Sequence, residues 1–417
     1  MSSATDISIL FATRITRLFA YGFLSIILVL YLVQVGLHER EIGLLLTLTL
    51  AGDAVISLWI TTSADRIGRR KMLIIGALLM SFAGLVFVST GNIFLLTLAA
   101  VIGVISPSGH EIGPFLSIEQ SALAQMVPAE KRTHVFAWYN LAGSFATATG
   151  ALCGGVLAKK LQDAGFMAVE SYQVVLAGYI VCGIILVLLF LCLSPVVETA
   201  SRINVEHRTF GLHDSKGVVL RLSGLFALDA FAGGLIIQSI LAYWFYLKFG
   251  ADESILGGVF FGANILAGMS ALLAARIAAR IGLINTMVFT HIPSNILLCL
   301  VPLMPTLTSA IALLLLRFSI SQMDVPTRQS YIMAVVAPDE RSAAAGITAI
   351  ARSSGAALSP AISGLFLAVP ALISVPFFLS GGLKIIYDVL LYRAFIKLKP
   401  PEEQARHNTF PLPPGEG

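Results

Sequence analysis

Ionisable side chains stand inside long apolar segments of this 417-residue chain. A charged group at the centre of a membrane helix costs about 2.5–3.5 kcal/mol on insertion scales, so each one is a candidate for a function. Buried acids can bind and release protons, and buried bases can hold an anionic group. The candidates for a substrate or proton cavity are Arg14, Arg17, Asp53, Glu111, Glu119, Asp229, Asp324 and Arg328.

Spacing along the chain and depth in the membrane predict which of the charged residues within the spans pair with each other. Arg17 and Asp53 lie at similar depth on antiparallel neighbouring segments, so they can pair. Lys384 and Asp388 are four residues apart on one helix face, and we expect them to neutralise each other as a structural pair.

The segments that carry these charges are long enough to cross a membrane. The chain is 57% apolar and only 12% charged, whereas a soluble domain is about 25% charged. A membrane helix needs about 20 apolar residues, and strands do not form uninterrupted apolar runs of this length. The sequence therefore predicts an all-α membrane protein with twelve transmembrane helices, at 9–33, 41–64, 72–90, 93–125, 133–158, 172–194, 218–247, 254–275, 284–303, 307–336, 343–368 and 372–396.

The distribution of Lys and Arg predicts the orientation of these helices. Positive residues concentrate in the connections on one side, which the positive-inside rule assigns to the cytoplasm. Both termini and the polar connection 195–217 then lie in the cytoplasm, and we expect a multi-pass protein of a bacterial plasma (inner) membrane. The four cysteines stand singly, which excludes a disulfide scaffold, and the sequence predicts no metal and no cofactor.

The two halves of the chain share a pattern. Arg66–Gly68 aligns with Arg280–Gly282, and Pro128 aligns with Pro338. An even number of spans in each half makes this a parallel repeat about an axis along the membrane normal. The expected domains are a six-helix bundle at 1–194, a cytoplasmic linker at 195–217, a second six-helix bundle at 218–399 and a disordered tail at 400–417.

The repeat places an acid and a base at equivalent positions. Glu119 in the fourth span aligns with Arg328 in the tenth, and both are near the middle of the membrane. We expect them to face each other, or to hold a zwitterionic substrate from two sides.

A charged motif follows the second span: Asp65, Arg66, Gly68, Arg69 and Arg70. Arginines can pair with the acid across the short turn that Gly68 permits, and such a network can hold one conformation and release another. The motif is therefore a candidate conformational latch. The alternative is simple anchoring of the positive loop in the cytoplasm.

Twelve spans, a parallel six-plus-six repeat and this Asp-Arg-x-Gly-Arg-Arg motif resemble the major facilitator superfamily over essentially the whole chain. The family motif begins with Gly four residues before the acid, where this chain has Thr61. The fifth span carries Gly150, Gly154 and Gly155 in a pattern similar to the family's antiporter motif, with Ala151 in place of its Pro. The resemblance implies the drug/proton antiporter-like branch, although small residues also serve any tight helix pair.

Two Pro and two Gly lie within residues 106–114, and they predict a break or kink in the fourth span. A broken helix exposes backbone groups that can bind a ligand. His110 within it can carry a proton near neutral pH, or can lie idle at the outer mouth.

These features predict a secondary transporter that works by alternating access, most simply proton-coupled efflux of a small organic molecule. The alternative is proton-coupled uptake or exchange of an organic anion or metabolite, and a third reading is a receptor or scaffold that no longer transports. No phosphate-binding GxxxxGK[ST] motif and no HExxH pair occurs, so the sequence predicts neither an ATP-driven pump nor an enzyme. The expected partners are a small-molecule substrate, protons and the lipid bilayer, with no nucleic acid, and the expected active form is a monomer.

Overall fold

The computed structural model describes residues 3–110, 115–198, 212–213, 215–337 and 340–398. The described part of the chain is helical and contains no strand. Glu111 and the tail at 400–417 lie outside the described residues, as do the side chains of Asp65 and Arg66. Most of the linker, 199–211, lies outside them too.

The twelve expected spans correspond to the described helices, which confirms the fold class. The first half contains α1 (Ser3–Ser25) with α2 (Leu28–Gln34), α3 (Glu39–Ile67), α4 (Arg69–Ser89), α5 (Ile93–Ile102) with α6 (Phe115–Met126), α7 (Ala129–Asp163) and α8 (Ala168–Leu191). The second half contains α9 (Lys216–Gly234) with α10 (Gln238–Phe249), α11 (Glu253–Ile281), α12 (Leu283–Leu300), α13 (Leu307–Phe318) with α14 (Asp324–Val335), α15 (Arg341–Leu367) and α16 (Val375–Phe395). Short 3₁₀ turns, η1 to η3, cover Pro195–Glu198, Val301–Leu303 and Pro370–Leu372.

Four spans are divided into two pieces, and they are the first, fourth, seventh and tenth. The sequence predicts the break in the fourth span, where α5 ends at Ile102 and α6 begins at Phe115. It does not predict the breaks after Ser25, Gly234 and Phe318. In the described part of the chain, nine helices are long and apolar enough to cross a membrane. The number is smaller than twelve in part because some spans are divided into two short helices.

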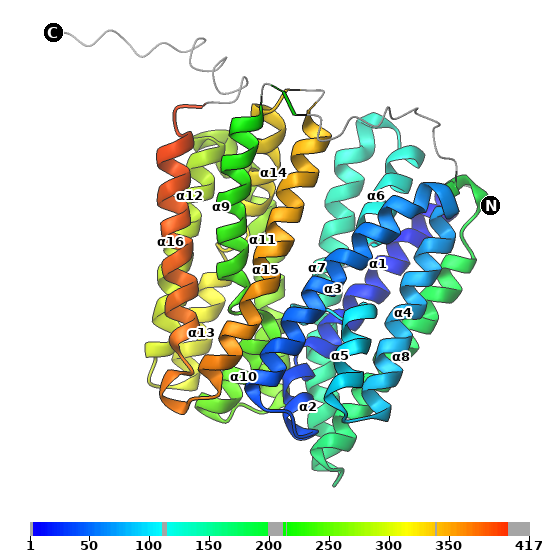
Figure 1. The fold of residues 1–417 in the computed structure, drawn as a ribbon, viewed down its shortest axis with the longest axis vertical. Coiled ribbons are helices and arrows are strands. Elements are labelled where there is room, and N and C mark those ends of the chain that lie inside the picture. Colours follow the sequence, from blue (N-terminus) through cyan, green and yellow to red (C-terminus); the bar gives the residue numbers. More distant parts are fainter. Residues whose placement is uncertain (1–2, 111–114, 199–211, 214, 338–339, 399–417) are drawn as a thin grey trace, which may run out of the picture.

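Figure 1 shows the two bundles side by side, with α1 beginning and α16 ending at the same end of the molecule. We call this end the linker side, because η1 and the start of α9 also lie there, and we call the opposite end the far side. The halves meet along two helix pairs, α7 with α11 and α3 with α15. Within the first half α7 also packs along α1, and within the second α15 packs along α9.

Glycines allow these close crossings. A Cβ added at Gly150 or Gly154 of α7 would lie 2.1–2.2 Å from a backbone oxygen of α1. One added at Gly155 would lie 2.1 Å from the Glu253 oxygen of α11. At the other crossing, Gly43 of α3 lies against Gly364 of α15. The glycines of the fifth span therefore allow close helix packing in this structure, both within the first half and between the two halves.

We expect Gly155→Ala to destabilise the contact between the halves. Overpacking of a tight site costs about 1–3 kcal/mol, because backbone must move. Gly258→Ala is the matched control, since nothing lies within 4 Å of a Cβ added there, and alanine is otherwise the better helix former. Thermal unfolding in detergent should show a lower melting temperature for Gly155→Ala alone. Equal melting temperatures would mean that this crossing is not tight.

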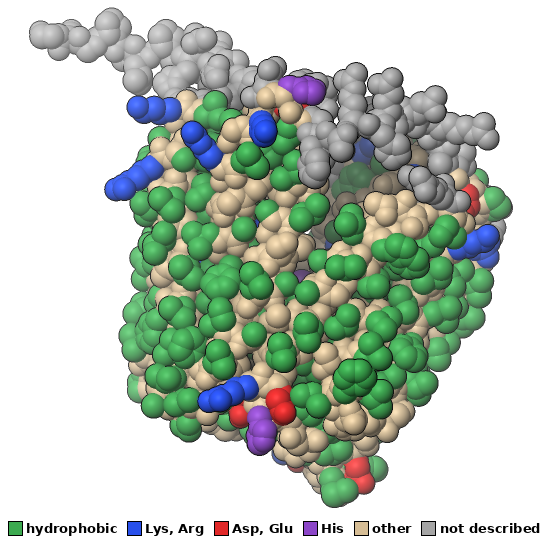
Figure 2. Space-filling model, in the orientation of Figure 1, with side chains coloured by type: hydrophobic (Ala, Val, Ile, Leu, Met, Phe, Trp, Pro, Cys, Tyr) green, Lys and Arg blue, Asp and Glu red, His purple; other side chains and the backbone are tan. Residues whose placement is uncertain are grey.

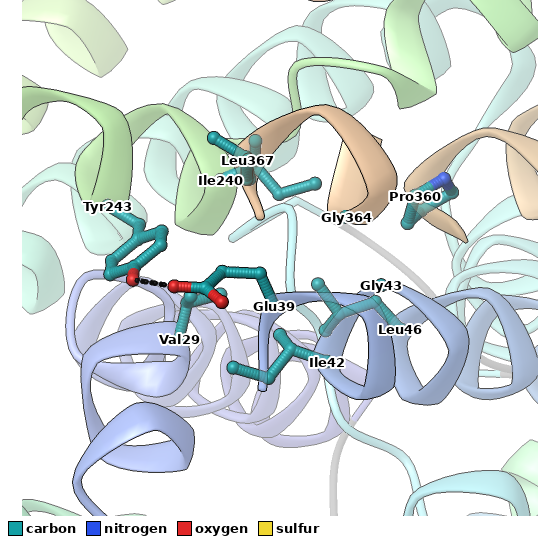
Figure 3. A pocket seen from close by; sticks show the side chains of 10 residues that line it. All are labelled: Val29, Glu39, Ile42, Gly43, Leu46, Ile240, Tyr243, Pro360, Gly364 and Leu367. Carbon is teal, nitrogen blue, oxygen red and sulfur yellow. Dashed lines mark hydrogen bonds between the residues drawn. The ribbon is translucent and has the colours of Figure 1, made fainter. Parts of the chain in front are cut away.

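Hydrogen bonds join the halves on the far side. Gln238 at the start of α10 donates to Ser25 at the end of α1, at 2.7 Å, and the Ser239 amide donates to the Pro107 carbonyl at 3.1 Å. Tyr243 donates to Glu39 at 2.8 Å beside a small pocket, where Figure 3 shows the two side chains pointing toward each other. On the linker side, Figure 2 shows the surface hollowed between the halves. The halves are thus joined on the far side and separated on the linker side.

Candidate functional site

Each half holds a buried charge cluster at the level of its broken helices. In the first half Arg17 of α1 makes a bidentate ion pair with Glu119 of α6, at 2.8 and 2.7 Å. Thr13 donates to the same carboxylate at 2.8 Å, and so does the Tyr139 hydroxyl of α7. All four side chains are completely buried. We call these four residues the Glu119 cluster.

Arg14 extends this cluster to Asn140 of α7. Its guanidinium lies 4.4 Å from the centre of the Tyr139 ring and donates to Asn140 at 3.1 Å. Asn140 is exposed, whereas the Arg17 guanidinium is buried against the ring of Phe115 at 4.6 Å. Aromatic faces attract desolvated cations, so the two rings offset part of the cost of burying these guanidinium groups.

In the second half Asp229 of α9 is the centre of a larger cluster. Its carboxylate accepts from Lys384 at 2.6 Å, from Arg352 at 3.2 Å and from Arg328 at 3.3 Å. Arg328 also donates to Asp324 at 2.9 Å, one turn away on α14. The Asp229 carboxylate therefore joins α9 to three other helices, α14, α15 and α16.

His291 of α12 connects this centre with a third acid. Its Nδ1 lies 2.9 Å from Asp388 and its Nε2 lies 4.0 Å from Asp229. Asn295, one turn further along α12, donates to Asp388 at 3.1 Å. We call the residues of this network the Asp229 cluster: Asp229, His291, Asn295, Asp324, Arg328, Arg352, Lys384 and Asp388.

Both clusters are built so that buried charges are compensated. The three acids and three permanent bases of the Asp229 cluster sum to zero when His291 is neutral. A proton on His291 changes that sum by one and places a cation between two carboxylates. Arg352 is the exception in burial, because 34% of its side chain is exposed. Among the described members it is the most exposed base.

Two pairings expected from the sequence differ from those in the structure. Glu119 and Arg328 do not bind each other, because each is bound by partners of its own half. Lys384 reaches across to Asp229 instead of binding Asp388 on its own helix. In both cases a partner on another helix displaces the expected one, and the helix contacts that decide this are not visible in one sequence. Arg17 makes a bidentate pair with Glu119, and its predicted pairing with Asp53 stays a prediction.

The other predicted cavity residues are placed as follows. Asp53 of α3 accepts from Ser57 at 3.4 Å, one turn away. Asp324 and Arg328 lie together, as described above. Glu111 and the side chains of Asp65 and Arg66 lie outside the described residues, so their predicted roles stay predictions.

The rest of the loop motif holds the linker-side ends of three helices of the first half together. Gly68 has a φ of +113°, which glycine adopts without strain. The next two amides, of Arg69 and Arg70, donate to the Glu198 carboxylate of η1 at 2.8 and 3.0 Å. Arg70 also binds the Phe190 carbonyl at the end of α8, and Arg69 binds Gln125 of α6. Glu198 therefore caps α4, a role that the sequence does not predict.

We expect Glu198→Ala to cost about 1–2 kcal/mol of stability, because two amides at the start of α4 lose their acceptor. Glu198→Gln should cost less, since its amide oxygen can still accept one of these bonds. The melting temperature of the three proteins in detergent measures the effect. Equal losses for Ala and Gln would assign the stabilisation to charge instead of capping.

Sequence reasoning missed several members of the clusters. His291 is a titratable residue within a span, and a search that includes histidine would have found it. Arg352 and Lys384 are visible as charges within spans, but their common partner Asp229 is not. Tyr139 and Thr13 carry no sequence signal, because hydroxyls in membrane helices commonly bond to their own backbone.

Two facing bundles with broken inner helices, paired charges at mid-depth and a hollow between them define a membrane transporter. The Major Facilitator Superfamily model matches residues 10–360, and the chain belongs to that family. It is therefore an integral multi-pass membrane protein of a transporter family, as the apolar helices also indicate. The drug/proton antiporter-like branch is not separately supported.

The chain is similar to a yeast membrane protein over nearly its whole length. The uncharacterized membrane protein YJR124C of Saccharomyces cerevisiae is 29% identical over 94% of this chain and 95% of its own length. Since this relative is from a yeast, nothing in the comparison supports the bacterial membrane expected from the sequence.

Solved structures of transporters share the fold at low identity. A bacterial homologue of the human lysosomal transporter Spinster, in an inward-facing and occupied conformation, superposes with a TM-score of 0.72 at 17% identity, covering 94% of this chain and 97% of that one. A D-xylose–proton symporter gives 0.69 at 15% identity, covering 93% and 97%. The nucleoside transporter NupG gives 0.71 at 14% identity, covering 94% and 99%.

Proposed function

We propose that this protein is a proton-coupled secondary transporter that moves a small organic molecule by alternating access. The observation that carries the proposal is the pair of charge clusters, one in each half, on the two sides of a hollow that opens on the linker side. Charges buried in a membrane are costly, and they are kept where a substrate or proton path needs them. One chain suffices, since the hollow lies between its own halves.

We take the linker side as cytoplasmic, following the positive-inside distribution of Lys and Arg. The structure then corresponds to a conformation open to the cytoplasm, with the far-side hydrogen bonds closing the outer face. The domains at 1–194 and 218–399 are the two rocking bodies of this proposal. Export is the preferred direction, on the family resemblance of the glycine pattern in α7.

A second candidate is uptake or exchange of an organic anion. The 34% exposure of the Arg352 side chain favours it, because a guanidinium that is partly exposed can take up a ligand. Bidentate binding of a carboxylate is the contact that a guanidinium makes best.

Reconstitution with a pH-sensitive dye inside the vesicles tests both candidates. Full-length protein in liposomes that contain pyranine is offered uridine, D-xylose, dialanine and benzoate in turn, without a pH gradient. Coupled transport changes the internal pH when a compound is added, and a protonophore abolishes the change. A signal with benzoate alone, which liposomes without protein do not give, favours the anion candidate. Labelled compound that enters without any pH change would contradict proton coupling.

A further inference from the structure

A polar seam lies between α12 and α16, behind the Asp229 centre. It is formed by His291, Ser294 and Asn295 of α12 and by Ser380 and Asp388 of α16. Each of these side chains is at least 95% buried, and four of them are buried completely. Two helices in a membrane can pack with apolar or small residues alone, so this number of buried polar side chains on two packed helices needs a reason.

Three polar atoms of the α12–α16 seam have no hydrogen-bond partner among the described residues: Ser294 Oγ, Asn295 Oδ1 and Ser380 Oγ. An unsatisfied buried polar group costs about 1–3 kcal/mol. Buried polar atoms of this kind are usually satisfied by buried water. The seam therefore has the chemistry of a water site.

The corresponding seam of the first half, between α4 and α8, differs in this respect. Its buried tyrosine, Tyr179, donates to the Val104 carbonyl at 2.5 Å. Its serine, Ser81, donates to the Ala77 carbonyl of its own helix at 3.1 Å. These hydroxyls are satisfied without water, so the fold itself does not require a polar seam.

The position of the seam connects it with the far side. α12 runs from the linker side at Leu283 to the far side at Leu300, so Asn295 lies one turn beyond His291 in the outward direction. α16 runs the opposite way, and Ser380 lies two turns outward of Asp388. The residues that carry the unpartnered atoms thus come after His291 on α12 and before Asp388 on α16, toward the side that the halves close.

We propose that the α12–α16 seam binds water and carries protons between the far side and the His291–Asp388 pair, separately from the substrate hollow. A proton leaves water in the seam and binds Asp388 or the neighbouring ring nitrogen of His291, and the opposite ring nitrogen releases one toward Asp229. No other bond changes. This proposal rests on the proton coupling proposed above.

Charged groups on several neighbouring helices lie near this pair, besides Arg317 of α13, a helix that packs against α12. They are Asp229 of α9, Asp324 and Arg328 of α14, Arg352 of α15 and Lys384 of α16. A proton that arrives at His291 through the seam adds a cation beside Asp229, where it competes with Lys384, Arg328 and Arg352. Protonation from the far side can in this way loosen the bonds that hold α14, α15 and α16 to α9.

X-ray radiolytic footprinting of the purified full-length protein tests for water, because radicals formed from bound water oxidise adjacent side chains. Tyr387 lies at the inner end of the seam, with its ring 6.0 Å from that of His291, and Tyr179 is the matched control in the first half. Both are at least 99% buried. We expect Tyr387 to be modified at least about tenfold faster than Tyr179, and we expect Asn295→Leu to remove the difference. Equal slow rates, or fast modification of Tyr387 that survives Asn295→Leu, would overturn the water site.

The dye-loaded liposomes then test the proton path. Ser380→Ala should slow proton movement driven by a transported probe at least about tenfold, while exchange of labelled probe without net proton movement stays within about twofold of wild type, because Ser380 is not a member of the Asp229 cluster. Ser81→Ala in the α4–α8 seam should change neither rate. Wild-type proton flux in Ser380→Ala would overturn the seam as a path and leave the proposed function intact. Probe transport without proton movement in the wild type would overturn both.

Discussion

Glu119→Gln should unfold the protein far more readily than most single substitutions. The change leaves the Arg17 guanidinium fully buried without its carboxylate, and removal of one partner of a buried ion pair costs about 3–5 kcal/mol. Replacing both partners, as Arg17→Met with Glu119→Gln, should recover much of this loss, because no charge is then stranded. Melting temperatures of the four proteins in detergent measure the coupling between the two sites.

The matched control for this cycle joins Glu119→Gln with Arg328→Gln. These two residues belong to different clusters, so we expect their melting shifts to add. A strong coupling between Glu119 and Arg328, with none between Glu119 and Arg17, would contradict the cluster assignment.

Asp229→Asn should abolish transport and destabilise the second half. Three cations share this carboxylate, and its loss leaves Lys384, Arg328 and Arg352 to repel one another in a buried site. The stability cost should reach about 3–5 kcal/mol, as for other stranded buried charges. Adding Lys384→Met should restore part of the stability without restoring transport, because it removes the cation with the shortest contact.

Asp324→Asn is the control for Asp229→Asn. It removes an acid of the same cluster that binds a single cation, Arg328, which keeps Asp229 as its other partner. We therefore expect a smaller loss of stability than for Asp229→Asn, measured by thermal unfolding in detergent. Equal losses would mean that Asp229 is not the shared centre of the cluster.

The spans could be predicted because bilayer thickness fixes the length of a crossing helix, and apolar runs such as 172–194 carry that signal directly. The helix breaks after Ser25 and Gly234 could not be predicted from the sequence. No proline marks either one, and both positions are stabilised by contacts between the halves, such as the bond from Gln238 to Ser25. Tertiary contact, which a sequence does not display, overrides local helix preference there.

The sequence predicts which charged residues belong to the candidate site, but it does not predict which of them form ion pairs with each other. Hydropathy identifies Glu119 and Asp229, because a charge in an apolar run is conspicuous. Their partners follow from which helices touch. Arg17 reaches Glu119 because α1 lies beside α6, and Lys384 reaches Asp229 because α16 lies beside α9. His291 escaped notice because only Asp, Glu, Lys and Arg were counted as charges within the spans.

The distance between the halves on each side of the membrane tests the central claim most directly. Spin labels on Lys71→Cys and Arg341→Cys measure the linker side, and labels on Arg40→Cys and Leu372→Cys measure the far side, all in a protein without its native cysteines. These positions are exposed, and each pair joins the two halves. Alternating access predicts that at low pH, or with a transported probe, a second population appears in which the linker-side distance is shorter and the far-side distance is longer. A single unchanged distance on both sides under every condition would contradict the account.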